Sequence, residues 1–145
     1  MVWMMQKIEL LASLKSEISN EEFEQIRSGE MPHLGASNRD LILKMMEDTR
    51  VSDEWIDDAI VERLRNITYE YLAEQLTGYP EVWKWIFICC AYTTYILGEP
   101  MHSREWVHYT TKQVNGKTEY YCPMKSSKPD TNCSFCVCRY LEEMN

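Results

Sequence analysis

Residues 81–97, EVWKWIFICCAYTTYIL, decide the fold of this chain. Placed on a helix they are apolar on most sides, which is typical of a central helix that other elements surround. Gly98 and Pro100 follow and predict where this helix ends. The stretch is about one turn shorter than the roughly 20 residues that a membrane-spanning helix needs, and Lys84 interrupts it. We therefore expect a buried helix over 81–97.

Two helices are expected at the start of the chain. Residues 4–18 carry apolar side chains at three- and four-residue steps, which predicts one amphipathic helix. Ser19 followed by Glu22 is the capping box of a second, short helix, and Gly29 is typical of its end. The predicted apolar stripe of the first helix consists of Met4, Ile8, Leu11, Leu14 and Ile18.

Two more helices are expected between a loop at 30–36 and the central helix. Ser37 followed by Asp40 predicts the start of the third helix. Ser52 predicts the N-cap of a longer fourth helix, and Gly78 predicts its end. The apolar residues expected to face the core are Leu41, Ile42, Met45 and Met46 in the third helix, and Ile56, Ile60, Leu64, Ile67 and Tyr71 in the fourth.

The hydrophobic period changes after the central helix. Two runs rich in β-branched and aromatic residues, 107–114 and 117–122, flank the dipeptide Asn115-Gly116. This is the strongest short-range signal of a β-hairpin with a two-residue type I′ turn. Cross-strand pairs of opposite charge, or of an aromatic and a β-branched side chain, support a register. Counting from the turn, we expect Lys112 opposite Glu119 and Thr111 opposite Tyr120.

Length and charge limit the class of protein. A chain of 145 residues with 45% apolar and 26% charged residues is typical of one globular domain. We expect a mainly α domain, 1–145, with about five helices in a helical body (1–98), then a β-hairpin and a Cys-rich, metal-knuckle-like segment (99–145). The net charge of the chain is −8, and residues 1–100, with 18 acidic and 9 basic residues, contribute −9 while residues 101–145 contribute +1. Because an acidic surface repels phosphate backbones, no nucleic acid partner is expected.

The N-terminal residues argue against a secretory signal. Lys7 and Glu9 come too soon for the apolar core of a signal peptide. With no membrane-spanning stretch either, we expect a cytoplasmic protein and no membrane partner. Thiols stay reduced in the cytoplasm, which weakens a disulfide explanation of the cysteines described next.

Four cysteines lie close together near the C-terminal end, with the spacing C-x10-C-x2-C-x-C. Zinc binds thiolates in a tetrahedron, and two cysteines separated by two residues bind one ion from a single turn. Cys133 and Cys136 form such a pair, and the hairpin supplies Cys122 as a third ligand. The fourth ligand is open between Cys138, which is near in sequence, and His102, which follows the central helix.

Other interpretations of the cysteines stay open. Reduced cysteines often simply pack in a core, and a redox or disulfide function would use the same thiols. Cys89 and Cys90 lie in the apolar central helix, and we expect both to be core residues. No nucleophile–base set, phosphate loop or nucleotide fingerprint stands in the sequence, so no catalytic or organic cofactor-binding residue is predicted.

The C-terminal third resembles a known family. The segments 99–102 (Glu-Pro-Met-His), 120–125 (Tyr-Tyr-Cys-Pro-Met-Lys) and 133–136 (Cys-x-x-Cys) are similar to the closing part of an uncharacterised family, found mainly in methanogenic archaea and catalogued as a domain of unknown function. The resemblance covers about 95–138, with Ser103 standing where the family pattern has proline. It implies a methanogen cytoplasm and no activity. The metal ligands that it implies are His102, Cys122, Cys133 and Cys136.

These observations together favour a non-enzymatic protein. A zinc site with four protein ligands is closed and leaves no position for a substrate. We therefore expect a structural zinc ion and a helical surface that binds another protein. The alternative is an iron–sulfur or redox protein that uses the same cysteines. An enzyme of unidentified class ranks below both, because no acid–base pair is identifiable.

Overall fold

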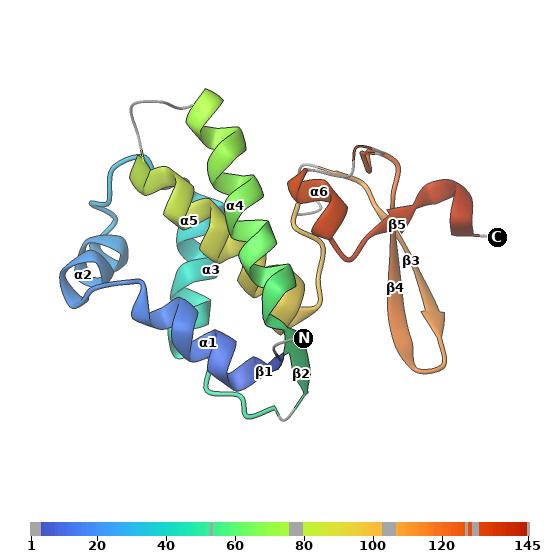
Figure 1. Ribbon diagram of the computed structural model, residues 1–145, viewed down its shortest axis with the longest axis horizontal. Coiled ribbons are helices and arrows are strands. Elements are labelled where there is room, and N and C mark those ends of the chain that lie inside the picture. The colour runs from blue at the N-terminus through green and yellow to red at the C-terminus, as the bar shows by residue number, and fades with distance from the viewer. Residues whose placement is uncertain are drawn as a thin grey trace.

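The computed structural model describes residues 4–52, 54–75, 80–102, 107–126, 128 and 131–144. This part of the chain is mainly helical. Figure 1 shows α1 to α5 gathered in one body, with the strands β3, β4 and β5 beside it. The elements are β1 (Met4–Gln6), α1 (Lys7–Ser16), α2 (Asn20–Ser28), α3 (Ala36–Glu47), β2 (Trp55–Asp57), α4 (Asp58–Gln75), α5 (Pro80–Ala91), the π-helix η1 (Tyr92–Leu97), β3 (Thr110–Val114), β4 (Lys117–Cys122), α6 (Asn132–Phe135), β5 (Arg139–Tyr140) and the 3-10 helix η2 (Leu141–Met144).

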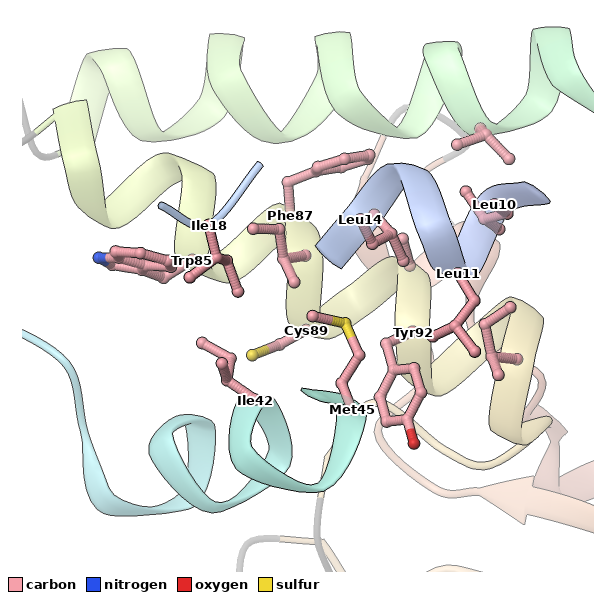
Figure 2. Packing of buried hydrophobic residues seen from close by; sticks show 14 of the residues in the cluster. Leu10, Leu11, Leu14, Ile18, Ile42, Met45, Trp85, Phe87, Cys89 and Tyr92 are labelled. Carbon is pink, nitrogen blue, oxygen red and sulfur yellow. The ribbon is translucent and has the colours of Figure 1, made fainter. Parts of the chain in front are cut away.

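Helix α5 continues into η1 and forms the centre of the helical body. The two segments contact α1, α3 and α4. The side chains of Trp85, Phe87 and Tyr92 are at most 1% exposed, and Figure 2 shows them among residues of α1 and α3. The prediction of a buried central helix is confirmed. Gly98 ends it with a φ of +66°, in the left-handed region that favours glycine.

The start of α2 follows its predicted capping box. Ser19 Oγ accepts a hydrogen bond from the Glu22 N–H at 3.0 Å, and the Glu22 carboxylate accepts one from the Ser19 N–H at 3.0 Å. Gly29 ends the helix with a φ of +80°. Helix α3 begins one residue before the predicted Ser37, with Gly35 as its N-cap and no side-chain cap bond. Of the four apolar residues predicted to face the core in α3, Ile42 and Met45 are buried and Leu41 and Met46 partly buried.

The beginning of the chain differs from the predicted helix. Strand β1 takes residues 4–6 and pairs antiparallel with β2, with Met5 opposite Ile56. Successive side chains of a strand point to opposite faces, so Met5 and Ile56 turn toward the core while Met4 is 48% exposed. Ile8 is exposed as well, so the predicted stripe holds only for its later members, Leu11, Leu14 and Ile18, and Leu10 is buried beside them.

The predicted start of α4 is also wrong. Residues 55–57 form β2, so the helix begins at Asp58, and its cap is Asp57, whose Oδ1 accepts a hydrogen bond from the Ala59 N–H at 2.9 Å. Ser52 Oγ accepts a local bond from the Glu54 N–H, ahead of β2. The buried face of the helix is displaced accordingly: Ile60 and Tyr71 are exposed, whereas the buried residues are Val61, Leu64, Ile67, Thr68 and Leu72.

The hairpin forms with the predicted register, Lys112 opposite Glu119 and Thr111 opposite Tyr120. Asn115 and Gly116 have φ values of +53° and +78°, as a type I′ turn requires. Strand β5, which was not predicted, adds to the hairpin by pairing parallel with β4. Helix α6 ends at Phe135, and the chain then extends into β5. Among the described residues, no helix is long and apolar enough to cross a membrane.

The carboxylate of Asp48, at the end of α3, should make the stability of the helical body depend on pH. Burial acts to raise the pKa of Asp48, but hydrogen bonds from Arg50 and from Tyr92 Oη, the latter at 2.7 Å, outweigh it and lower this pKa from 3.8 to about 2. A carboxylate with a lowered pKa stabilises the fold above its unfolded pKa, and this contribution is lost as the pH falls through the folded pKa.

We expect Asp48→Asn to lower the free energy of unfolding by about 1 to 3 kcal/mol near neutral pH, the usual cost of weakening buried hydrogen bonds. The difference between the two proteins should shrink as the pH falls from 3.8 toward about 2. Urea unfolding at several pH values measures both quantities. A difference that stays constant over this range would assign the effect to packing rather than to the charge.

Candidate functional site

The candidate site is a cavity of about 640 Å3 between the helical body and residues 107–144, which we call the tail. Its walls come from α3, α4, α5, the segment after Gly98, the hairpin, α6 and the residues between β4 and α6. Every side chain that the sequence analysis considered as a metal ligand lines this cavity. The potential donors on its wall are Cys90, His102, Cys122, Cys133, Cys136 and Cys138.

Helix α6 docks on the helical body and positions the Cys133–Cys136 pair. Asn132 Nδ2 donates a hydrogen bond to Thr68 Oγ1 at 2.8 Å, and the buried Thr68 hydroxyl donates to the Leu64 carbonyl at 2.8 Å. The guanidinium of Arg63 lies 5.7 Å from the ring centroid of Phe135. These contacts hold α6, which carries Cys133, against α4.

Backbone N–H groups point at the two sulfurs of this pair. Cys133 Sγ accepts from the Ser126 N–H at 3.2 Å, and Cys136 Sγ accepts from the Met101 N–H at 3.4 Å. The ammonium of Lys125 donates to the carbonyls of both cysteines, each at 3.2 Å. For Cys136, the Met101 N–H and the charge of Lys125 favour the thiolate, which is the form that binds metals.

Cys138 lies in direct contact with Cys136. The hydrogen bond from the Cys138 thiol is the largest influence on Cys136 and, with backbone donors and Lys125, lowers the pKa of Cys136 against the effect of burial. The same bond, together with burial and the charge of Cys136, raises the pKa of Cys138. One thiolate and one thiol are therefore the favoured states of this pair.

Cys90, which was expected to be a core residue, packs partly against the core and also lines the cavity. Cys89 is a core residue as predicted, 5% exposed and surrounded by apolar side chains (Figure 2). The next residue is turned by roughly 100° around the helix, and this turn brings Cys90 to the cavity. Burial raises the pKa of Cys90 to about 11, with the hydrogen bond from Asn132 acting in the opposite direction and the charge of Cys136 adding to the rise. Because adjacent residues of a helix face different directions, the sequence could have predicted different surroundings for Cys89 and Cys90.

The donor types fit a thiophilic metal, since thiolate and imidazole are the ligands that zinc and iron take in proteins. In the part of the chain that the structure describes, however, no group of three His, Cys, Asp or Glu side chains is arranged so that it could hold a metal ion. Binding therefore requires the side chains on the cavity wall to draw together. The metal knuckle and its ligands stay a prediction.

A comparison with protein families matches residues 4–140 to an uncharacterised protein family conserved in archaea (DUF2115). The chain belongs to this family. The match confirms the resemblance noted in the C-terminal third and extends it over the helical body. Searches of the curated proteins and of the solved structures found no match for this member of the family.

Proposed function

We propose that this member of the family is a small cytoplasmic, non-enzymatic protein with a structural zinc ion in the tail and a helical surface that binds another protein. The proposed ligands are Cys122, Cys133 and Cys136. The donors proposed for the fourth position are His102 and, alternatively, Cys138. Bound zinc supplies four coordinate bonds from side chains and no redox chemistry.

The observation that carries this proposal is the set of thiols around one cavity. Four tail cysteines from three different segments line it, and two of their sulfurs, those of Cys133 and Cys136, accept backbone hydrogen bonds. Outer-shell donors of this kind orient the side chains that bind a metal. Cysteines that merely filled a core would need no such donors.

A structural role follows from the composition of the tail. Within its described residues only Tyr121, Cys122 and Cys138 are buried. A segment of this size with so few buried side chains lacks the hydrophobic burial that would hold it folded, and small units of this kind commonly need a metal or a disulfide. Zinc would supply that stabilisation.

The proposal that the helical body binds another protein rests on apolar side chains at its start. Met4, Trp55 and Ile60 are 48%, 58% and 42% exposed, and they come from β1, β2 and the first turn of α4. Exposed apolar patches on a small protein commonly mark interaction sites. The partner is proposed to be a protein rather than a nucleic acid, since residues 1–100 are strongly acidic.

The metal itself tests the proposal. Protein produced and purified without oxygen should be colourless and carry about one zinc ion per chain, because zinc has a filled d shell and one tetrahedral site takes one ion. Elemental analysis and an absorption spectrum are the measurements. A brown product with iron and acid-labile sulfide would establish the iron–sulfur alternative instead. A protein that is free of metal after purification and also fails to take up added zinc would contradict both the zinc site and the iron–sulfur alternative.

A further inference from the structure

Two sulfurs of the tail, those of Cys136 and Cys138, meet at the wall of the cavity. The Cys138 thiol donates a hydrogen bond to Cys136 Sγ, and both side chains line the cavity. Even in a straight strand, the Cα atoms of residues two apart lie about 6.6 to 6.8 Å from each other, a separation that a disulfide can still span. The backbone therefore allows a bond between these two sulfurs.

The two thiols differ in their access to the cavity. Cys136 is half-buried, whereas Cys138 is only 5% exposed. The Met101 N–H donates to Cys136 Sγ at 3.4 Å, and Lys125 Nζ donates to the Cys136 carbonyl at 3.2 Å, so that negative charge on this sulfur is stabilised. An accessible thiol beside a shielded one is the arrangement of an attacking and a resolving cysteine.

We propose that Cys136 and Cys138 form a thiol–disulfide exchange site for disulfides of low molecular weight that enter the cavity. Cys136 attacks the substrate, and Cys138 resolves the mixed disulfide. The cavity, of about 640 Å3, lies within the size range of small-molecule sites. This inference goes beyond the proposed function, because it rests on the contact between two sulfurs and needs no metal.

The exchange balances in atoms and electrons. The thiolate of Cys136 attacks one sulfur of the substrate disulfide, whose S–S bond breaks, and the other half leaves as a thiolate. Cys138 passes its proton to that thiolate and attacks Cys136 Sγ, and the second half leaves. The cysteine pair is thereby oxidised by two electrons to a disulfide, and the substrate is reduced to a thiol and a thiolate. An excess of low-molecular-weight thiol reverses both steps.

The pair Cys133 and Cys136 has the C-x-x-C spacing of many redox motifs, but its sulfurs are held by different segments. Cys133 Sγ accepts from the Ser126 N–H at 3.2 Å, whereas Cys136 Sγ accepts from Met101. The contact with the Cys138 thiol therefore selects Cys138, rather than Cys133, as the partner of Cys136.

Glutathione disulfide is the probe that tests this site. The reduced full-length protein, kept free of oxygen, should release two glutathione molecules per chain, as the reaction requires. Tandem mass spectrometry after alkylation of the free thiols should find a disulfide between Cys136 and Cys138. Cys138→Ser should release one glutathione and keep a mixed disulfide on Cys136. The control Cys90→Ala removes another thiol of the cavity and should react like the wild type.

The result for the wild type decides the inference even if a variant fails to fold. Absence of the disulfide between Cys136 and Cys138, or a disulfide that joins Cys133 to Cys136, would overturn it. The zinc content of the same samples separates this inference from the proposed zinc site. A Cys136–Cys138 disulfide in protein that binds no zinc would contradict the zinc site alone. Zinc-loaded protein that forms no disulfide would contradict the exchange site alone.

Discussion

Replacing Cys133 by serine should expose the tail to trypsin while the helical body survives. In a domain of this kind, the free energy of metal binding is folding free energy for the segment that supplies the ligands. The tail has few buried side chains of its own, whereas the body has a continuous core from α1 to η1. Loss of one ligand should therefore release the tail locally rather than unfold the whole chain.

The cleavage sites are already present in the tail. Lys112 and Lys117 are exposed on the hairpin, and Lys125 donates to the carbonyls of the cysteine pair. A protease needs the chain to open locally, so the rate of cleavage reports the free energy of that opening. We expect cleavage in the tail to be at least about tenfold faster for Cys133→Ser, because a loss of 1.4 kcal/mol already changes an opening equilibrium tenfold.

The control variant is Ser134→Ala, which alters an exposed residue between the two cysteines of the pair. It should be cleaved at the wild-type rate. Treating the wild type with a chelator should reproduce the pattern of Cys133→Ser, with a fragment of the helical body left intact. Equal protease resistance of the wild type, Cys133→Ser and chelator-treated protein would refute a structural metal, whatever ion the protein carries.

The parts of the fold that could be predicted from sequence are those with local signals. The capping box of Ser19 and Glu22 joins residues three positions apart, and the turn at Asn115 and Gly116 sets its own register. The central helix was recognisable because its side chains are apolar on most sides. In each case the decisive interactions lie within one element and its immediate neighbours, so the pattern of residue types contains them.

The incorrect predictions concern elements that form by pairing between segments far apart in the sequence. Met5 pairs with Ile56 across some fifty residues of sequence, and this pairing converts two predicted helix starts into the strands β1 and β2. A strand of three residues has no periodicity that distinguishes it from a helical turn. Strand β5 is a similar case, since only its pairing with β4 makes two residues of the tail a strand.

The candidate site was predictable in composition but not in arrangement. Ligand type and spacing pointed to the cysteines of the tail, and all of them line one cavity. Cys90 was assigned to the core because an apolar helix gives no indication of which residue faces a cavity formed by another segment. Spacing along the chain also says nothing of whether sulfurs lie close enough together to bind an ion.

The second large effect should follow from Phe87→Ala. Phe87 is fully buried at the centre of the helical body, its ring centroid lies 4.2 Å from the guanidinium of Arg65, and its ring meets Tyr69 edge-on with centroids 6.4 Å apart. Truncating a buried phenylalanine removes its burial and leaves a cavity, at a cost of about 3 to 5 kcal/mol. That is a large share of the 5 to 15 kcal/mol of stability typical of a domain.

Urea unfolding followed by circular dichroism measures this loss. The matched control is Tyr71→Ala, which truncates an aromatic side chain that is 59% exposed on α4, and we expect it to cost less than about 1 kcal/mol. A loss below 1 kcal/mol for Phe87→Ala would contradict the central position of α5. The two large effects should also differ in extent. Phe87→Ala should make residues on either side of Gly98 accessible to protease together, because the tail docks on α4 and α5, whereas Cys133→Ser should release the tail alone.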